Sequence, residues 1–150
     1  MAKNMPLIVL ALLALGLTIA PGIVWIILGS EGLNEPCLDL EKTPNLAVWL
    51  IVEGSLLLGI ACVTMLTLPF KFSDNGMAKT MKFLGFFILA LFGMFHFAWL
   101  IIGSVRLSQQ DEYFPSCESR SYSLYQTTLA AIIMGWISLV CTCIVCFLFY

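Results

Sequence analysis

Charged side chains are scarce in this sequence. Asp, Glu, Lys and Arg make up 11% of its 150 residues, whereas ordinary globular domains carry about 25%. Apolar residues make up 61%, and the mean hydropathy is +1.00. So few charges cannot cover a surface that faces water, which excludes a soluble globular domain and indicates an integral membrane protein. The lipid bilayer is therefore the first expected partner, and the net charge of −2 gives no sign of a nucleic-acid partner.

Histidine is rarer still, because His96 is the only one in the chain. The sequence also contains no HExxH motif, no glycine-rich phosphate loop and no Ser-His-Asp set. A single histidine excludes haem held between two imidazoles and leaves a zinc site short of ligands. A chain of 150 residues forms one helix bundle with no room for a separate catalytic domain. We therefore expect no enzymatic activity, no cofactor and no metal.

Long apolar runs, by contrast, are abundant. They cover approximately residues 7–29, 46–70, 83–105 and 123–150. A helix needs about 20 such residues to cross a bilayer, so the sequence predicts an all-α membrane protein, a single four-transmembrane-helix bundle over residues 1–150. The first run is longer than a signal-peptide core of about 7–15 residues, and we interpret it as a retained span. Pro21 inside this run predicts a helix kink, because its ring removes one backbone donor.

The basic residues and two cysteines predict how the bundle is oriented. The N-terminus and the 71–82 linker are slightly richer in basic residues than the two longer loops, which places the N- and C-termini in the cytosol. Cys37 and Cys117 lie one in each long loop, on the side predicted to be outside. Oxidising compartments favour a disulfide there, and two free thiols are the alternative. We expect an integral membrane protein of the secretory pathway or the plasma membrane.

Two ionisable residues interrupt the apolar runs. Glu53 lies eight residues after Asn45, and His96 lies eight residues before Ser104. At 1.5 Å per residue, both side chains lie about 12 Å below the same membrane boundary. A carboxylate in hydrocarbon usually faces a partner or a water-filled cavity. Glu53 and His96 are therefore the candidate intramembrane polar pair, either as a proton- or cation-sensitive site or as a hydrogen bond that fixes the bundle.

The remaining cysteines suggest lipidation more than redox chemistry. Cys141, Cys143 and Cys146 gather near the end of the fourth run. Cysteines near the cytosolic face are candidates for reversible palmitoylation, and packing as buried apolar residues is the alternative. A reactive thiolate needs basic or helix-N-terminal surroundings, and this helix end has neither.

Tryptophans and small residues recur at informative positions. Trp25, Trp49 and Trp99 each fall about one turn inside the outer end of a span, where membrane proteins carry an aromatic belt. Small residues spaced four apart let helix backbones approach closely in lipid. Such pairs are Gly16 with Ala20, Ser55 with Gly59, and Ala131 with Gly135. We expect these pairs to pack helices together within the bundle. A dimer interface is the less favoured alternative.

Short motifs occur in order along most of the chain. They are Cys37, Pro44, the run Trp49-Leu50-Ile51-Val52 followed by Gly54, Trp99, Gly103, Pro115, Cys117 and Tyr125. With these residues the sequence resembles the small four-span membrane proteins grouped around transmembrane protein 272. The resemblance implies a four-helix integral membrane protein.

The expected function is non-enzymatic. Short loops and small cytosolic segments leave lipid-facing helix as almost all of the available surface, so partners are expected within the membrane. We therefore expect an accessory or interaction subunit of a larger membrane complex, bound through helix faces to another membrane protein or to copies of itself. The alternative is a homo-oligomeric channel or transport protein with Glu53 and His96 in an intramembrane path.

Overall fold

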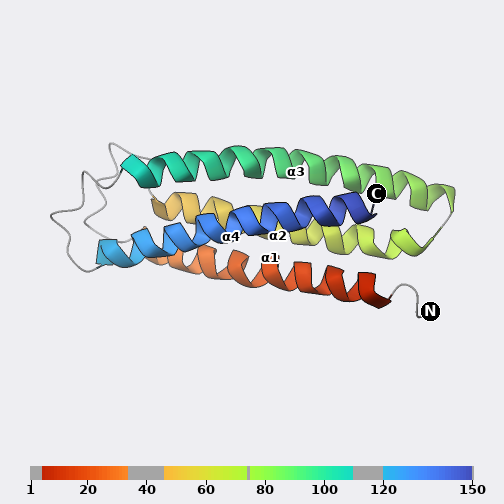
Figure 1. The fold of residues 1–150 in the computed structure, drawn as a ribbon, viewed down its shortest axis with the longest axis horizontal. Coiled ribbons are helices and arrows are strands. Elements are labelled where there is room, and N and C mark those ends of the chain that lie inside the picture. The colour runs from red at the N-terminus through yellow and green to blue at the C-terminus, as the bar shows by residue number, and fades with distance from the viewer. Residues whose placement is uncertain (1–4, 34–45, 74, 110–119, 150) are drawn as a thin grey trace.

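Four long helices make up the computed structural model, which describes residues 5–33, 46–73, 75–109 and 120–149. They are α1 (Met5–Gly32), α2 (Leu46–Thr67), α3 (Gly76–Gln109) and α4 (Arg120–Phe149), with a short 3₁₀ helix, η2 (Leu68–Phe72), after α2 (Figure 1). All four helices are long and apolar enough to cross a membrane. The prediction of an all-α bundle with four helices that can each span a membrane is therefore confirmed. Cys37 and Cys117 lie outside the described residues, so the disulfide between them stays a prediction.

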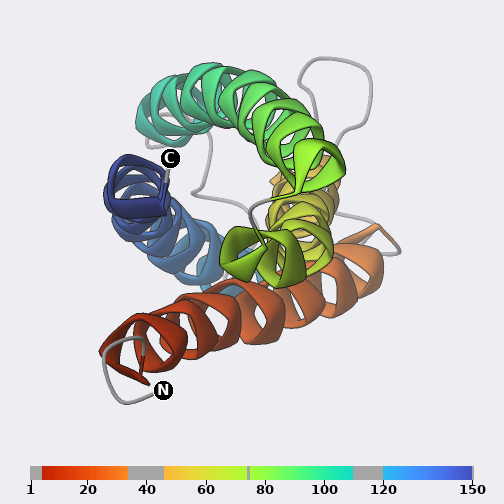
Figure 2. The same ribbon diagram turned by 90° about the vertical axis from the view of Figure 1, so that its right-hand side faces the viewer.

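The four helices lie along one long axis (Figure 1). We call the end at which α1 and α3 finish the long-loop end, and the opposite end, which contains η2, the short-turn end. Seen along the axis, α1, α2, α3 and α4 follow one another around the bundle, and α4 closes against α1 (Figure 2). At the short-turn end α3 extends beyond the end of α4 (Figure 1).

The connection between α2 and α3 is shorter than the sequence predicts. A linker is expected over residues 71–82, whereas α3 begins at Gly76. Asn75 O accepts a hydrogen bond from Lys79 N, so the helical hydrogen bonding of α3 begins at Asn75. Residues 77–82 are rich in methionine, alanine and lysine, which all favour helix, so they join α3. Pro69 lies in η2 and ends the α-helical part of the second run.

Glycines bring α1 and α2 into backbone contact. A methyl group built on Gly54 would clash with Gly22 O, and one built on Gly29 would lie 2.7 Å from Ala47 O. Only glycine allows the two backbones to approach this closely, which is how helices gain packing energy in lipid. α1 runs as one helix through Pro21, and the kink angle at this residue stays a prediction.

The buried core is concentrated on α2. Within the apolar windows of the helices, 56% of the α2 residues are buried but only 22% of those of α3. The core cluster joins Trp25, Trp49, Leu50, Leu57 and Leu100 with residues of α4. α2 is therefore the central helix, and α3 is the helix that faces outward most.

Candidate functional site

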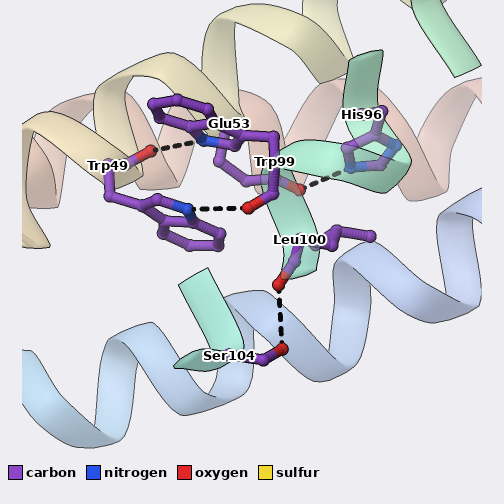
Figure 3. Close-up of polar contacts among 6 residues, drawn as sticks. All are labelled: Trp49, Glu53, His96, Trp99, Leu100 and Ser104. Atoms are coloured by element: carbon purple, nitrogen blue, oxygen red, sulfur yellow. Dashed lines mark hydrogen bonds and ion pairs between the residues drawn. The ribbon is translucent and has the colours of Figure 1, made fainter. Parts of the chain in front are cut away.

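Glu53 and His96 meet inside the bundle. His96 Nε2 lies 2.7 Å from Glu53 Oε1, and neither side chain has any exposed surface (Figure 3). The structure thus brings together the two residues that the sequence places at one depth. With Nε2 protonated, the imidazole donates to the carboxylate, and the contact becomes an ion pair when both ring nitrogens carry a proton.

A pair of tryptophans lies one turn nearer the long-loop end. Trp49 Nε1 donates to Trp99 O at 3.1 Å, and Trp99 Nε1 donates to Trp49 O at 3.4 Å, so each indole binds the backbone of the other residue (Figure 3). The rings are parallel within 2°, with centroids 6.5 Å apart. A methyl group on Gly103 would clash with the Trp49 ring. Gly103 is therefore needed for the indole of Trp49 to lie against α3.

α4 covers the polar pair. A methyl group built on Gly135 would lie 2.8 Å from Glu53 Oε1 and 2.5 Å from Leu100 Cδ2. Because Gly135 has no side chain, its backbone lies against the carboxylate and helps to exclude lipid from it. Three helices therefore build the site: α2 supplies Glu53, α3 supplies His96, and α4 supplies the glycine that lets the bundle close.

Four buried side-chain atoms, two of them in the polar pair, have no hydrogen-bond partner among the described residues. They are Glu53 Oε2, His96 Nδ1, Ser138 Oγ and Trp25 Nε1. A buried polar atom without a partner is costly, so the pair retains unused donor and acceptor capacity. The site can therefore hold and pass a proton between a carboxyl group and an imidazole, or serve as a polar connection between α2 and α3. The described residues contain no cluster of three metal-ligating side chains.

Other residues singled out from the sequence have different surroundings. Cys143 is exposed, Cys141 is partly buried, and both are free thiols. The side chain of Cys146 lies outside what the structure describes. Palmitoylation of these three cysteines stays a prediction.

Two expectations about packing are corrected. Trp25 and Trp49 are 8% and 3% exposed and belong to the core, so they do not form a lipid-facing aromatic belt. The Gly16 and Ala20 pair lies on an exposed stretch of α1, where nothing comes within 4 Å of a methyl group built on Gly16. By contrast, Ala131 and Gly135 are buried against the rest of the bundle. Spacing alone does not show which small residues face a neighbouring helix.

The glycines of α1 that contact α2 are not among the small-residue pairs predicted from the sequence. Gly22 and Gly29 lie seven residues apart on α1 and both contact α2. Seven residues are about two helical turns, so this spacing is the signal that places them on one face. Comparisons with protein-family models, curated proteins and solved structures found no match. The resemblance to the transmembrane protein 272 group therefore rests on its short motifs alone.

Proposed function

We propose that this protein is a non-enzymatic accessory or interaction subunit, which binds a transmembrane helix of another membrane protein through one face of α3. The observation that carries this proposal is the exposure of α3. Its apolar window is the least buried of the four, at 22%. The helix has 34 residues, or about 51 Å, and exceeds the hydrocarbon thickness of about 30 Å.

A regular stripe of large side chains follows this face. It consists of Phe87, Leu91, Phe95 and Ile102, which are all exposed. Their spacings of four, four and seven residues keep them on one side of a helix. We call these residues the α3 stripe. In lipid, helices associate through van der Waals packing, and large side chains in one row give a partner helix a continuous surface to pack against.

The position of the polar pair supports the same function. Glu53 and His96 are fully buried within one chain, so they contact each other and not a second protein. A partner then meets mainly apolar side chains. The pair's role in this proposal is to fix the arrangement of α2 and α3, and thereby the direction in which the α3 stripe points.

The test is the composition of the native complex after extraction in mild detergent. We expect a different membrane protein to co-purify in fixed ratio, and a Phe87→Ala, Phe95→Ala double variant to lose it. A Leu12→Ala, Leu13→Ala variant is the matched control, because these side chains are equally exposed on α1. A ring of identical copies would favour the channel alternative, and a lone monomer would contradict the accessory function.

A second candidate is proton or cation transport through the buried pair. The unpartnered Glu53 Oε2, His96 Nδ1 and Ser138 Oγ favour it, because a transport path needs polar atoms beyond a single hydrogen bond. Full burial within one chain favours a path through each chain over a pore between copies. Proton flux into vesicles that contain purified protein tests this function: Glu53→Gln must abolish the flux, and absence of flux in the wild type rejects the candidate.

The proposal includes an orientation and a compartment. Both termini are cytosolic, a Cys37–Cys117 disulfide links the outer loops, and the protein resides in the secretory pathway or plasma membrane. The support is the lysine distribution and the placement of one cysteine in each long loop. Cys37→Ser should make Cys117 reactive towards an alkylating reagent. Equal labelling of Cys117 in the wild type would contradict the disulfide.

A further inference from the structure

An apolar groove runs between α3 and α4 toward the short-turn end. Its volume is about 940 Å³. Phe86, Gly93 and Phe97 line it from α3, and Leu139 and Cys143 line it from α4. Neither the Glu53 and His96 pair nor any residue of the α3 stripe lines the groove.

The dimensions of the groove fit hydrocarbon chains. Its α3 lining extends from Lys82 to Phe97, which is about 22 Å at 1.5 Å per residue. One leaflet of a bilayer is about 15 Å deep, half of the hydrocarbon thickness. The groove is therefore long enough for an acyl chain.

A lysine marks the end of the groove nearest the short-turn end. Lys82 lines the groove, and its Nζ donates to Ser73 O at 3.0 Å. An ammonium group carries three donors, so that bond alone does not saturate it. Lys79 is exposed one turn earlier on α3. A cation at one end of an apolar groove complements a ligand with an anionic head and a hydrocarbon tail.

We propose that this groove binds an anionic glycerophospholipid, with its acyl chain along Phe86, Gly93 and Phe97 and its phosphate on Lys82. This lysine-bearing end is also the end predicted to be cytosolic, where anionic lipids are concentrated. A palmitoyl chain on Cys143 would fill part of the same space. It carries no phosphate, however, and would leave Lys82 without an anionic partner, so the free phospholipid is the occupant that matches both ends of the groove.

The experiment uses the full-length protein in nanodiscs of equal parts phosphatidylcholine and phosphatidylglycerol, followed by native mass spectrometry of the lipids that it retains. We expect the wild type to retain phosphatidylglycerol in preference to phosphatidylcholine. Lys82→Gln should lower that preference about fivefold, which corresponds to the contribution of one basic residue near an anionic surface. Cys143→Ser serves only to show whether an acyl chain is linked to this thiol.

Two glycine variants test binding of the acyl chain separately from binding of the phosphate. Gly93→Leu should lower the retention of both lipids, because its side chain fills the groove. A Cβ built on Gly93 meets nothing within 4 Å, so this variant is expected to fold. Gly16→Leu is the matched control: Gly16 is equally open but lies on α1, outside the groove.

Three results would overturn the proposal. They are equal retention of the two lipids by the wild type, wild-type retention by Gly93→Leu, and a thioester-linked acyl mass that disappears in Cys143→Ser. None of them bears on the α3 stripe, so the groove and the proposed function stand or fall separately.

Discussion

The two halves of the bundle are held together differently. The buried residues of α2 all lie between Leu46 and Ala61, on the side of the long-loop end. Beyond them, Met65 and Leu66 on the same helix are 47% and 66% exposed. The Trp49–Trp99 contacts and the Glu53–His96 bond belong to the first half, whereas the apolar groove between α3 and α4 extends into the second.

This difference shows which interactions hold the helices of a bundle together in lipid. Lipid tails are as apolar as leucine, so apolar side chains alone give helices little reason to prefer one another. Close backbone contact and interhelical hydrogen bonds provide that preference, and the bundle has both around Gly54 and Glu53. Toward the short-turn end, α3 and α4 leave an apolar groove between them.

The largest expected effect comes from breaking the polar pair. His96→Leu leaves the Glu53 carboxyl group buried without its partner, which should lower the free energy of unfolding by about 3 kcal/mol. Unfolding in mixed micelles with increasing SDS measures this change. Ser55→Ala on α2 is the control, because its exposed hydroxyl bonds only to Ile51 O of its own helix. A loss for His96→Leu no larger than that of the control would show that the pair does not hold α2 to α3.

Two leucines of α2 compare the halves directly. Leu57 is buried and Leu66 is exposed on the same helix. Leu57→Ala should lower the free energy of unfolding by about 2 kcal/mol, because it leaves a cavity. Leu66→Ala should stay within about 0.5 kcal/mol of the wild type, as expected for an exposed position. Equal losses in the same unfolding assay would mean that the two halves are packed alike.

Much of the fold follows from composition alone. Four runs of sufficient length predict four spans, and counting residues from the ends of the runs places Glu53 and His96 at one depth. The rotation of each helix about its own axis does not follow, because the spans are apolar on all sides and show little amphipathic pattern. For this reason Trp25 and Trp49 are expected at the membrane interface, whereas they lie in the core.

The glycine contacts also depend on the rotation of each helix about its own axis, which the sequence does not show. Gly54 and Gly93 are both mid-helix glycines in apolar runs, and each lies within three residues of an ionisable side chain, Glu53 or His96, so the sequence does not show which of them faces a neighbouring backbone. In the structure, Gly54 touches the backbone of α1, and Gly93 opens onto the groove. Helix rotation decides between these environments, and only the packed bundle fixes that rotation.

Alanine substitutions at these two glycines should differ in their effect on the free energy of unfolding. Gly54→Ala should lower the free energy of unfolding by roughly 1.5 kcal/mol, because its methyl group meets Gly22 O and forces α1 away. Gly93→Ala meets no atom within 4 Å and should be neutral or slightly stabilising. The unfolding assay compares the two alanine variants side by side. Similar values would contradict close backbone contact between α1 and α2.

The smallest expected effect concerns one indole. Trp99→Phe keeps a ring beside Trp49 but removes the Nε1 donor to Trp49 O, and the loss should be about 0.5–1 kcal/mol. Trp136→Phe is a matched substitution elsewhere in the bundle, where the indole packs edge-on against Phe97. If Trp99→Phe costs no more than Trp136→Phe, the reciprocal indole bonds add nothing to the stability of the long-loop half.

A double-mutant cycle on Glu53 and His96 tests most directly whether this pair closes the bundle. Glu53→Met, His96→Leu and the combined variant are unfolded under identical conditions. The combined variant leaves no unpaired polar group behind, so it should lose about 2 kcal/mol less than the sum of the single losses. Losses that add within about 0.5 kcal/mol would show that the two side chains act independently, and would contradict a bundle fixed by their contact.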